Sequence, residues 1–315
     1  WETTDSKNVG IDFTLKNGKI SGSMNYYRNV TDNLLITKRL APSAGIDDPI
    51  LNVGKISNSG FELEVNYRDQ VNEFKYNVGF NLTTLKNKVE SLANEGQTIY
   101  GEGLKFGEEH FPTQARVGSP ISGFYLYKTD GIFQTVDEVN AHSKNGVLLQ
   151  PNAQPGDIRF KDLDGENGLN GDDRTMIGKP NPDWTYGFTL SADWKGVDFS
   201  AFFQGSIGND IYKLYRRSNV TFGNYDKSWL NRWHGEGTSN WVPRVIDGDN
   251  NNYQVSNFFV EDGSYMRLKV LQIGYSLPGQ MLQRVGIKGL RFFVQGENLF
   301  TITNYSGYDP EVGTR

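Results

Sequence analysis

The residues best suited to chemistry lie in one acidic stretch between positions 162 and 173. When this stretch is aligned with the calcium-binding loop of an EF-hand, five of its residues take ligand positions. They are Asp162, Asp164, Glu166, Gly168 (through its carbonyl) and Asp173. They fall at loop positions 1, 3, 5, 7 and 12. A hard cation binds six to eight oxygens, and this spacing can wrap such ligands around one point. The sequence therefore predicts a structural Ca²⁺ site.

Two residues depart from the calcium-loop pattern. Position 6 holds Asn167 where an EF-hand has glycine, although asparagine tolerates the left-handed backbone that the turn requires. Position 12 holds Asp173, whose short side chain makes bidentate binding harder than a glutamate would. No helical pattern flanks the stretch, so a bound ion would stiffen the loop and not catalyse a reaction. The alternative is an acidic turn held by its glycines and by Arg174.

A second group with binding chemistry is aromatic and lies in the segment 205–262, which we predict to be a loop. Its members are Tyr225, Trp229, Arg232, Trp233 and Trp241. Aromatic side chains commonly line ligand sites, and their faces can stack on sugar rings. The group is therefore a candidate contact for a substrate or for a capping partner. The alternative is that the three tryptophans bury the loop against itself or against that partner.

Other patterns argue against an enzyme. The three histidines, His110, His142 and His234, lack the spacing of metal ligands, and the Gly-x-Ser-x-Gly pattern of a nucleophile elbow is absent. The sequence contains no cysteine, which excludes disulfides and thiolate metal sites. A formal net charge of −5 gives no electrostatic reason to expect a nucleic-acid partner.

The scaffold for these groups is predicted from strict alternation of apolar and polar residues, which is clearest between 60 and 83. This pattern predicts two strands joined by a turn at Asp69 and Gln70, with one apolar and one polar face. The side chains that we expect to face lipid are Phe61, Leu63, Val65, Phe74, Tyr76, Val78 and Phe80. Those that we expect to face a lumen are Glu62, Glu64, Lys75, Asn77 and Asn81.

Similar alternation predicts about eight antiparallel strands along the chain. Short and long connections take turns between them. The short ones are 16–19, 69–72, 195–196 and, somewhat longer, 278–289; the long ones are 37–59, 85–183 and 205–262. Short turns at one end of a sheet and long loops at the other are typical of outer-membrane β-barrels. The predicted fold is therefore all-β, an antiparallel transmembrane β-barrel portion with short periplasmic turns and long extracellular loops.

The hydropathy of the chain is compatible with this fold. The mean hydropathy of −0.56 and the lack of a long apolar run exclude a helical membrane protein. Alternating strands average to a polar value, so a membrane barrel stays possible. The alternative is a soluble or surface β-sandwich that acts as a binding or adhesion module, with the same apolar faces buried in a core.

Short motifs also give the whole chain a resemblance to a known family. In chain order they are WETT (1–4), NVGID (8–12), NVGKI (52–56), NSGFE (58–62), PGDI (155–158), DLDG (162–165), IGKP (177–180), QG and GN (204–209), RW (232–233), GSYMRLK (263–269), GYSLP (274–278), NLF (298–300) and GYDPE (307–311). Their order and spacing resemble the SusC/RagA-like group of TonB-dependent outer-membrane transporters of Bacteroidota.

This resemblance implies a plugged barrel of the 22-stranded class. Residues 1–315 would be its C-terminal part, with the plug domain and the TonB-contacting segment before Trp1 and the closing strand after Arg315. It further implies an integral protein of the cell outer membrane, surrounded by its lipid. Such a protein works with a SusD-like surface lipoprotein lid and with TonB, which is reached through the N-terminal part. The implied function is uptake of a glycan or an oligopeptide.

Overall fold

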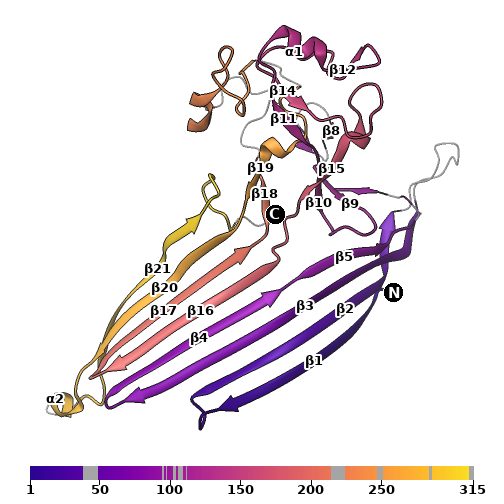
Figure 1. Ribbon diagram of the computed structural model, residues 1–315. Coiled ribbons are helices and arrows are strands. Elements are labelled where there is room, and N and C mark those ends of the chain that lie inside the picture. Colours follow the sequence, from indigo (N-terminus) through magenta and orange to yellow (C-terminus); the bar gives the residue numbers. More distant parts are fainter. Residues whose placement is uncertain are drawn as a thin grey trace. The chain divides into compact units, whose positions relative to one another are not determined.

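The computed structural model describes residues 1–37, 49–93, 96, 98–101, 104–105, 109–110, 112–213, 224–246, 251–283 and 286–311. The chain divides into two compact units (Figure 1). The first comprises Trp1–Glu95, Asn181–Asp210 and Asp262–Arg315, and the second comprises Gly96–Pro180 and Ile211–Glu261. Among the described residues, no helix has both the length and the apolar character needed to cross a membrane.

The first unit is built on one antiparallel sheet. Its strands follow the order β1 (Thr3–Leu15), β2 (Ile20–Thr37), β3 (Ile50–Val71), β4 (Phe74–Thr84), β16 (Trp184–Trp194), β17 (Val197–Ile207), β20 (Tyr265–Ser276) and β21 (Arg291–Thr303) (Figure 1). β5 (Lys86–Ser91) also pairs with β3, in nearly the same register as β4. The short helix α2 (Gly279–Gln283) lies between β20 and β21. The expectation of about eight antiparallel strands is confirmed.

The short connections can be compared with the predicted turns. The β1–β2 turn contains Asn17 and Gly18 as predicted, with φ angles of 55° and 84°. The predicted turn at Asp69 and Gln70 is wrong, because both residues pair with β4. The chain reverses instead beyond Val71, at Asn72, whose φ of 54° is the left-handed conformation that asparagine tolerates. β20 contains a register shift, typical of a β-bulge, between Leu268 and Val270.

Two predicted loop boundaries are also wrong. β3 begins at Ile50, although 37–59 was expected to be a loop, and residues 86–91 form β5. The apolar residues of 50–59 do not alternate strictly and 86–91 is mostly polar, so side-chain alternation does not mark either stretch as a strand. Their backbones are nevertheless paired, with Ile50 opposite Thr37 and Ser59 opposite Lys86. Part of the expected loop, residues 38–48, lies outside the described residues.

The second unit gathers most of the two longest predicted loops into small elements. They are β6 (Ile99–Tyr100), β7 (Leu104–Lys105), β8 (Glu109–His110), β9 (Thr113–Ala115), β10 (Gly123–Tyr127), β11 (Thr129–Ile132), α1 (Val136–Ala141), β12 (Ser143–Lys144), β13 (Val147–Leu148), β14 (Ile158–Phe160), η2 (Gly171–Asp173), β15 (Arg174–Gly178), β18 (Asp210–Tyr212), η3 (Lys227–Asn231), η4 (Asn257–Phe259) and β19 (Val260–Asp262). One turn of 3-10 helix, η3, lies within the segment 205–262 that was predicted to be a loop. These segments are therefore more ordered than the predicted irregular loops.

The second unit has its own apolar core. Its buried members are Phe124, Leu126, Tyr127, Ile158, Phe160 and Val255. A smaller cluster contains Phe133, Val139 and Ala153. Each contributing segment is only a few residues long, so none carries a strong periodic signal of its own. The core exists only when segments distant in sequence are brought together.

A buried ion pair ties three segments of this unit together. Asp157 is 1% exposed and accepts hydrogen bonds from Nε of Arg244, at 2.5 Å, and from Nδ2 of Asn252, at 3.0 Å. The backbone N–H of Gln154 donates to its other carboxylate oxygen. A buried charge is tolerated when it is paired and hydrogen-bonded in this way. The network fixes how 154–157, 244 and 252 meet.

We expect the second unit to lose stability as the pH falls below about 6.5, the ordinary pKa of histidine. The His142 ring packs edge-on against Phe133, with centroids 5.3 Å apart. Burial, and then nearby Arg159, lowers the pKa of His142 because both disfavour the imidazolium. At a pH between the two pKa values, the unfolded chain binds more protons than the folded chain. The contribution of neutral His142 to stability is therefore complete above the ordinary pKa and is lost as the pH falls toward the lowered pKa of the folded chain.

Hydrogen exchange of peptides from 123–160, corrected for the intrinsic effect of pH, would measure this loss between pH 7.5 and pH 5.5. His142→Gln should reduce the pH dependence, whereas His234→Gln, at an exposed position, should leave it unchanged. Equal pH dependence in the wild type and His142→Gln would contradict the assignment.

Candidate functional site

The two faces of the large sheet differ in chemistry. Directly opposite residues of antiparallel strands point to the same face, so the register assigns each side chain. Leu63 pairs with Leu82 and Val65 with Phe80, whereas Glu64 pairs with Asn81. The same register separates all the residues predicted for lipid from all those predicted for a lumen. The predicted segregation into two faces is confirmed.

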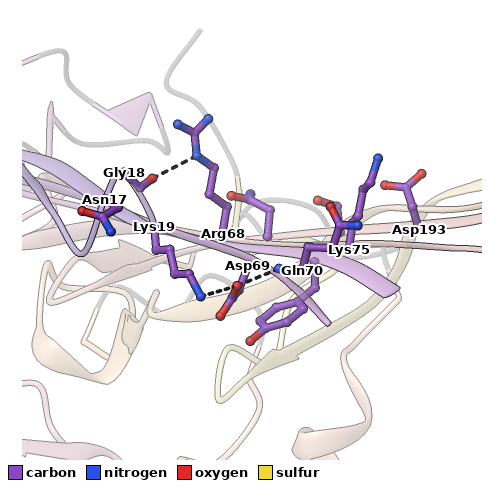
Figure 2. Close-up of a pocket in the computed structure, with 11 residues that line it drawn as sticks. Asn17, Gly18, Lys19, Arg68, Asp69, Gln70, Lys75 and Asp193 are labelled. Atoms are coloured by element: carbon purple, nitrogen blue, oxygen red, sulfur yellow. Dashed lines mark hydrogen bonds and ion pairs between the residues drawn. The ribbon is translucent and has the colours of Figure 1, made fainter. Parts of the chain in front are cut away.

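A polar pocket of about 430 Å³ opens at the short-turn end of the sheet. Figure 2 shows residues from the β1–β2 turn, β3, β4 and β16 around it. Nε of Arg68 donates to the Gly18 carbonyl at 3.0 Å, and Nζ of Lys19 lies 2.7 Å from a carboxylate oxygen of Asp69. These contacts close the turn against β3.

Two opposite charges in this pocket remain available for a ligand or another chain. Lys75 and Asp193 are register partners on β4 and β16. Among the described residues, neither the Lys75 side chain nor the Asp193 side chain has an ion-pair or hydrogen-bond partner. Figure 2 shows both side chains extending away from the sheet. The pocket can therefore hydrogen-bond water or a polar segment.

A second ion cluster lies at the beginning of β20. Arg267 is 7% exposed in its side chain; Nε donates to Oγ1 of Thr301 at 2.8 Å, and the guanidinium pairs with Asp309 and Glu311. Nζ of Lys269 lies 2.6 Å from the same Glu311 carboxylate. The cluster anchors residues 309–311, which follow β21, to β20. Sequence analysis matched both segments as motifs but did not identify them as partners, although their opposite charges were a usable signal.

The acidic loop of the second unit brings together three of its five predicted ligands. Carboxylate oxygens of Asp162, Asp164 and Asp173 all lie within 4.8 Å of one another. Glu166 is not part of this group, and its backbone N–H donates to Asp164 at 2.8 Å. Gly168 has a φ of 82° and provides a turn. The position-6 residue Asn167 is not among the left-handed residues, so the loop departs from EF-hand geometry there.

Asp173 is the centre of this loop. It is fully buried, and one carboxylate oxygen accepts from the N–H of Leu163 at 2.7 Å while the other accepts from Asn170 at 2.9 Å. The backbone N–H of Glu166 and the side-chain amide of Asn170 lower the pKa of Asp164 because they stabilise its charged form. The loop is closed by these internal bonds, and the Ca²⁺ site stays a prediction.

The predicted aromatic group divides into two parts. Tyr225 and Trp229 have ring centroids 5.4 Å apart, and Trp229 and Trp241 each contact Phe258. Trp233 instead donates from Nε1 to Gln134 at 3.1 Å and packs beside Gly156, where an added Cβ would lie 2.4 Å from its ring. Trp233 therefore has a structural role.

The exposed part of the aromatic group borders a pocket of about 520 Å³. Its walls include Tyr225, Trp229, Arg232, Leu230 and Val245. Sequence analysis missed Phe258, which joins Trp229 and Trp241; the doublet of Phe258 and Phe259 was the available signal. The arrangement is an apolar recess whose edge carries both cationic and anionic side chains, Lys227, Arg232 and Asp226, and it can contact an apolar group with polar substituents.

Comparison with known proteins places this sheet in a family. The profile described as "TonB dependent receptor-like, beta-barrel" matches residues 1–299. The chain belongs to this family. TonB-dependent receptors of this kind are outer-membrane β-barrels with receptor and transport roles. The resemblance inferred from short motifs is thus confirmed, and the β-sandwich alternative is wrong because the matched fold is a barrel.

Individual TonB-dependent receptors show how much of the family architecture this chain contains. TonB-dependent receptor P3 of Formosa agariphila is 33% identical over 322 residues, and SusC of Bacteroides thetaiotaomicron is 26% identical over 322 residues. These alignments cover 100% and 99% of this chain but only 31% and 30% of the relatives. The solved RagAB peptide transporter matches with a TM-score of 0.75 and 25% identity, over 99% of this chain and 33% of that chain. The chain spans about a third of its relatives' length.

We expect Ca²⁺ at millimolar concentration to slow hydrogen exchange in residues 158–178 of the full-length protein by roughly tenfold, because a cation would neutralise three converging carboxylates. Asp164→Asn should remove most of this effect. Asp137→Asn, on α1, is the matched control and should leave it intact.

Native mass spectrometry would count the bound ions. Absence of bound metal at millimolar Ca²⁺, with unchanged exchange, would contradict the predicted site and leave closure of the loop to its internal hydrogen bonds, including those of Asp164 and Asp173.

Proposed function

We propose that this chain forms part of the wall of an outer-membrane importer that takes up glycans or oligopeptides. The observation that carries the proposal is the eight-strand sheet with one apolar and one polar face. We name the outward part of the apolar face the apolar belt. Its residues include Val9, Ile11, Phe13, Leu15, Met24, Tyr26, Phe61, Leu63, Val65, Phe80, Val78, Phe188, Leu190, Ala201, Phe199, Leu271, Ile273 and Val294.

Exposure of the apolar belt supports a lipid environment. Val9 is 73% exposed and Val294 is 79% exposed in this chain. A contiguous apolar surface spanning eight strands would be unfavourable in water and is larger than soluble proteins normally present. In a membrane barrel, the same side chains contact hydrocarbon while the closed ladder satisfies every backbone polar group.

The opposite face suits a water-filled or plugged lumen. It carries a polar row of successive register partners across six strands, namely Arg68, Asn77, Ser191, Ser200, Gln272 and Gln295. These side chains can bond water, a polar solute or another part of the protein. The pocket containing Lys75 and Asp193 lies on this face, so we assign it to the lumen side near the short turns.

The connections orient the proposed wall. Outer-membrane barrels have short turns on the periplasmic side and long loops outside the cell. The turns after β1, β3 and β16 are short, whereas the second unit is formed from the connections after β4 and β17. We therefore assign the second unit to the extracellular side, where its aromatic pocket would be accessible to a substrate or a partner.

The named relatives suggest partners for the whole protein. One relative is SusC, and one solved structure is called a RagAB peptide transporter. We infer that the complete protein works with a SusD-like surface lipoprotein and receives energy through TonB, which would contact residues outside this chain. The chemistry of the described pockets does not separate glycans from oligopeptides, so the substrate class stays open between the two.

A pair of adjacent substitutions on β4 tests the assigned polarity. Val78→Arg should reduce the amount of full-length protein assembled in the outer membrane by at least about tenfold, because arginine at the bilayer midplane costs about 2–4 kcal/mol. Asn77→Arg, one residue away on the other face, should assemble at near the wild-type level. Heat-modifiable mobility on gels and outer-membrane fractionation would measure assembly. Equal effects of the two substitutions would contradict the assigned faces.

The import function is tested by deleting the gene and restoring the full-length protein. Cells lacking it should fail to grow on one glycan or peptide mixture and recover with the wild-type gene. Purification from native outer membranes should recover a lipoprotein in a stable complex. Normal growth on every tested polymer, together with purification as an isolated protein, would contradict the proposed function.

A further inference from the structure

Cationic side chains continue the apolar belt beyond its end on β1, β2 and β5. The register passes from Val9 opposite Tyr26 to Lys7 opposite Arg28, one step further along the same face. Arg28 is opposite Ser59 on β3, and Ser59 is opposite Lys86 on β5. We call Lys7, Arg28 and Lys86 the cationic row.

The strand register fixes the face on which this row lies. Pairing between β1 and β2 is continuous from Leu15 opposite Ile20 to Thr3 opposite Asp32, without a shift. Side chains two residues apart on a strand share a face. Lys7 therefore lies on the side of Val9, and Arg28 lies on the side of Tyr26. The row belongs to the proposed lipid-facing side and not to the lumen.

Nearby acidic groups neutralise only part of the positive charge of the cationic row. Asp5 lies 3.5 Å from Nζ of Lys7, and Glu90 lies 2.8 Å from Nζ of Lys88, a further lysine on β5. Arg28 and Lys86 are exposed, and neither forms an ion pair within 4.0 Å in the described part of the chain, although Arg28 attracts the Glu90 carboxylate over a longer distance. Two cations of the row are thus available to an external anion.

The row has the extent and position of a lipid headgroup site. Neighbouring strands are about 4.8 Å apart, so three interstrand steps spread the row over roughly 15 Å. It lies where the apolar belt ends, toward the end of the sheet that carries the long connections. Lipid phosphates lie at this boundary between hydrocarbon and water. Guanidinium binds phosphate through two parallel hydrogen bonds, and lysine adds a point charge.

We propose that the cationic row binds phosphate groups of anionic glycolipid in the outer leaflet, as supplied by lipopolysaccharide. This inference rests on the proposed function, because it requires the apolar belt to face the membrane with the second unit outside. Basic residues that immediately border a hydrocarbon-facing surface recognise anionic headgroups by this same electrostatic attraction. A protein cap over the barrel mouth would instead approach the loops, beyond the level of the row.

The test uses full-length protein, stripped of lipid in detergent and reconstituted in nanodiscs of phosphatidylcholine with a small fraction of purified lipopolysaccharide. The double variant Arg28→Gln/Lys86→Gln should retain about tenfold less lipopolysaccharide than the wild type. The matched control is Lys16→Gln/Lys195→Gln, which removes two positive charges in the short turns after β1 and β16 and should retain the wild-type amount. The difference should shrink at high salt because exposed charges are screened.

Inorganic phosphate, tested alone, distinguishes a lipid site from a site for soluble anions. Free phosphate that binds as tightly as lipopolysaccharide would overturn the lipid assignment. Unchanged retention by the double variant would overturn it as well, and so would loss of a co-purifying lipoprotein without loss of lipopolysaccharide. Wild-type protein that does not insert into nanodiscs would contradict the proposed membrane function itself, whereas inserted protein with unchanged retention contradicts only the row.

Discussion

The hydrogen-bonded register between neighbouring strands is the constraint on which the rest of this structure depends. A slip of one residue would move every apolar side chain of a strand to the polar face. Pairing is regular across the belt from β1 to β16, and Leu190 is opposite both Val78 and Ala201. Register shifts occur between Phe202 and Phe203 and between Leu268 and Val270, yet beyond the first shift the apolar Phe203 still lies opposite an apolar residue, Leu268. The shifts are therefore accommodated without exchanging the two faces.

The short motifs that carry the family resemblance acquire a physical meaning when their partners are known. Arg267 lies in one motif, and Asp309 and Glu311 lie in another, about forty residues later; the ion cluster joins them. Similarly, Gly156 of one motif has a φ of 92° and leaves room for the ring of Trp233 in another. In each of these two pairs, one motif supplies one partner of a contact and the other motif supplies the second partner. A weak local match can thus be specific in combination, because each half requires the other.

The sequence allowed prediction of those strands in which apolar and polar side chains alternate, because this alternation follows from the two different environments of the sheet faces. The belt strands alternate strictly, so their number and faces were predictable, whereas the apolar residues of 50–59 do not alternate and their strand is evident only from its pairing with β2. The second unit was missed because its core combines 123–127, 158–160 and Val255, each too short for a periodic signal. In the acidic loop, the meeting of Asp162, Asp164 and Asp173 followed from spacing. Glu166 lies outside this carboxylate group because of the backbone turns of the loop, which the spacing of acidic residues in the sequence does not specify.

The two units depend on different interactions, and this separates the wall from the chemistry around it. The sheet is held by ladder hydrogen bonds and by an apolar belt suited to hydrocarbon, and it tolerates exchange of one apolar residue for another on the belt. The second unit depends on a small core and on buried polar groups such as Asp157, where removal of one partner leaves a charge without compensation. Phe258 packs against that core, whereas Tyr225 and Trp229 belong neither to the core cluster nor to the network around Asp157. Substitutions of Tyr225 or Trp229 can therefore alter contacts with a ligand while both the core of the unit and the register of the wall are preserved.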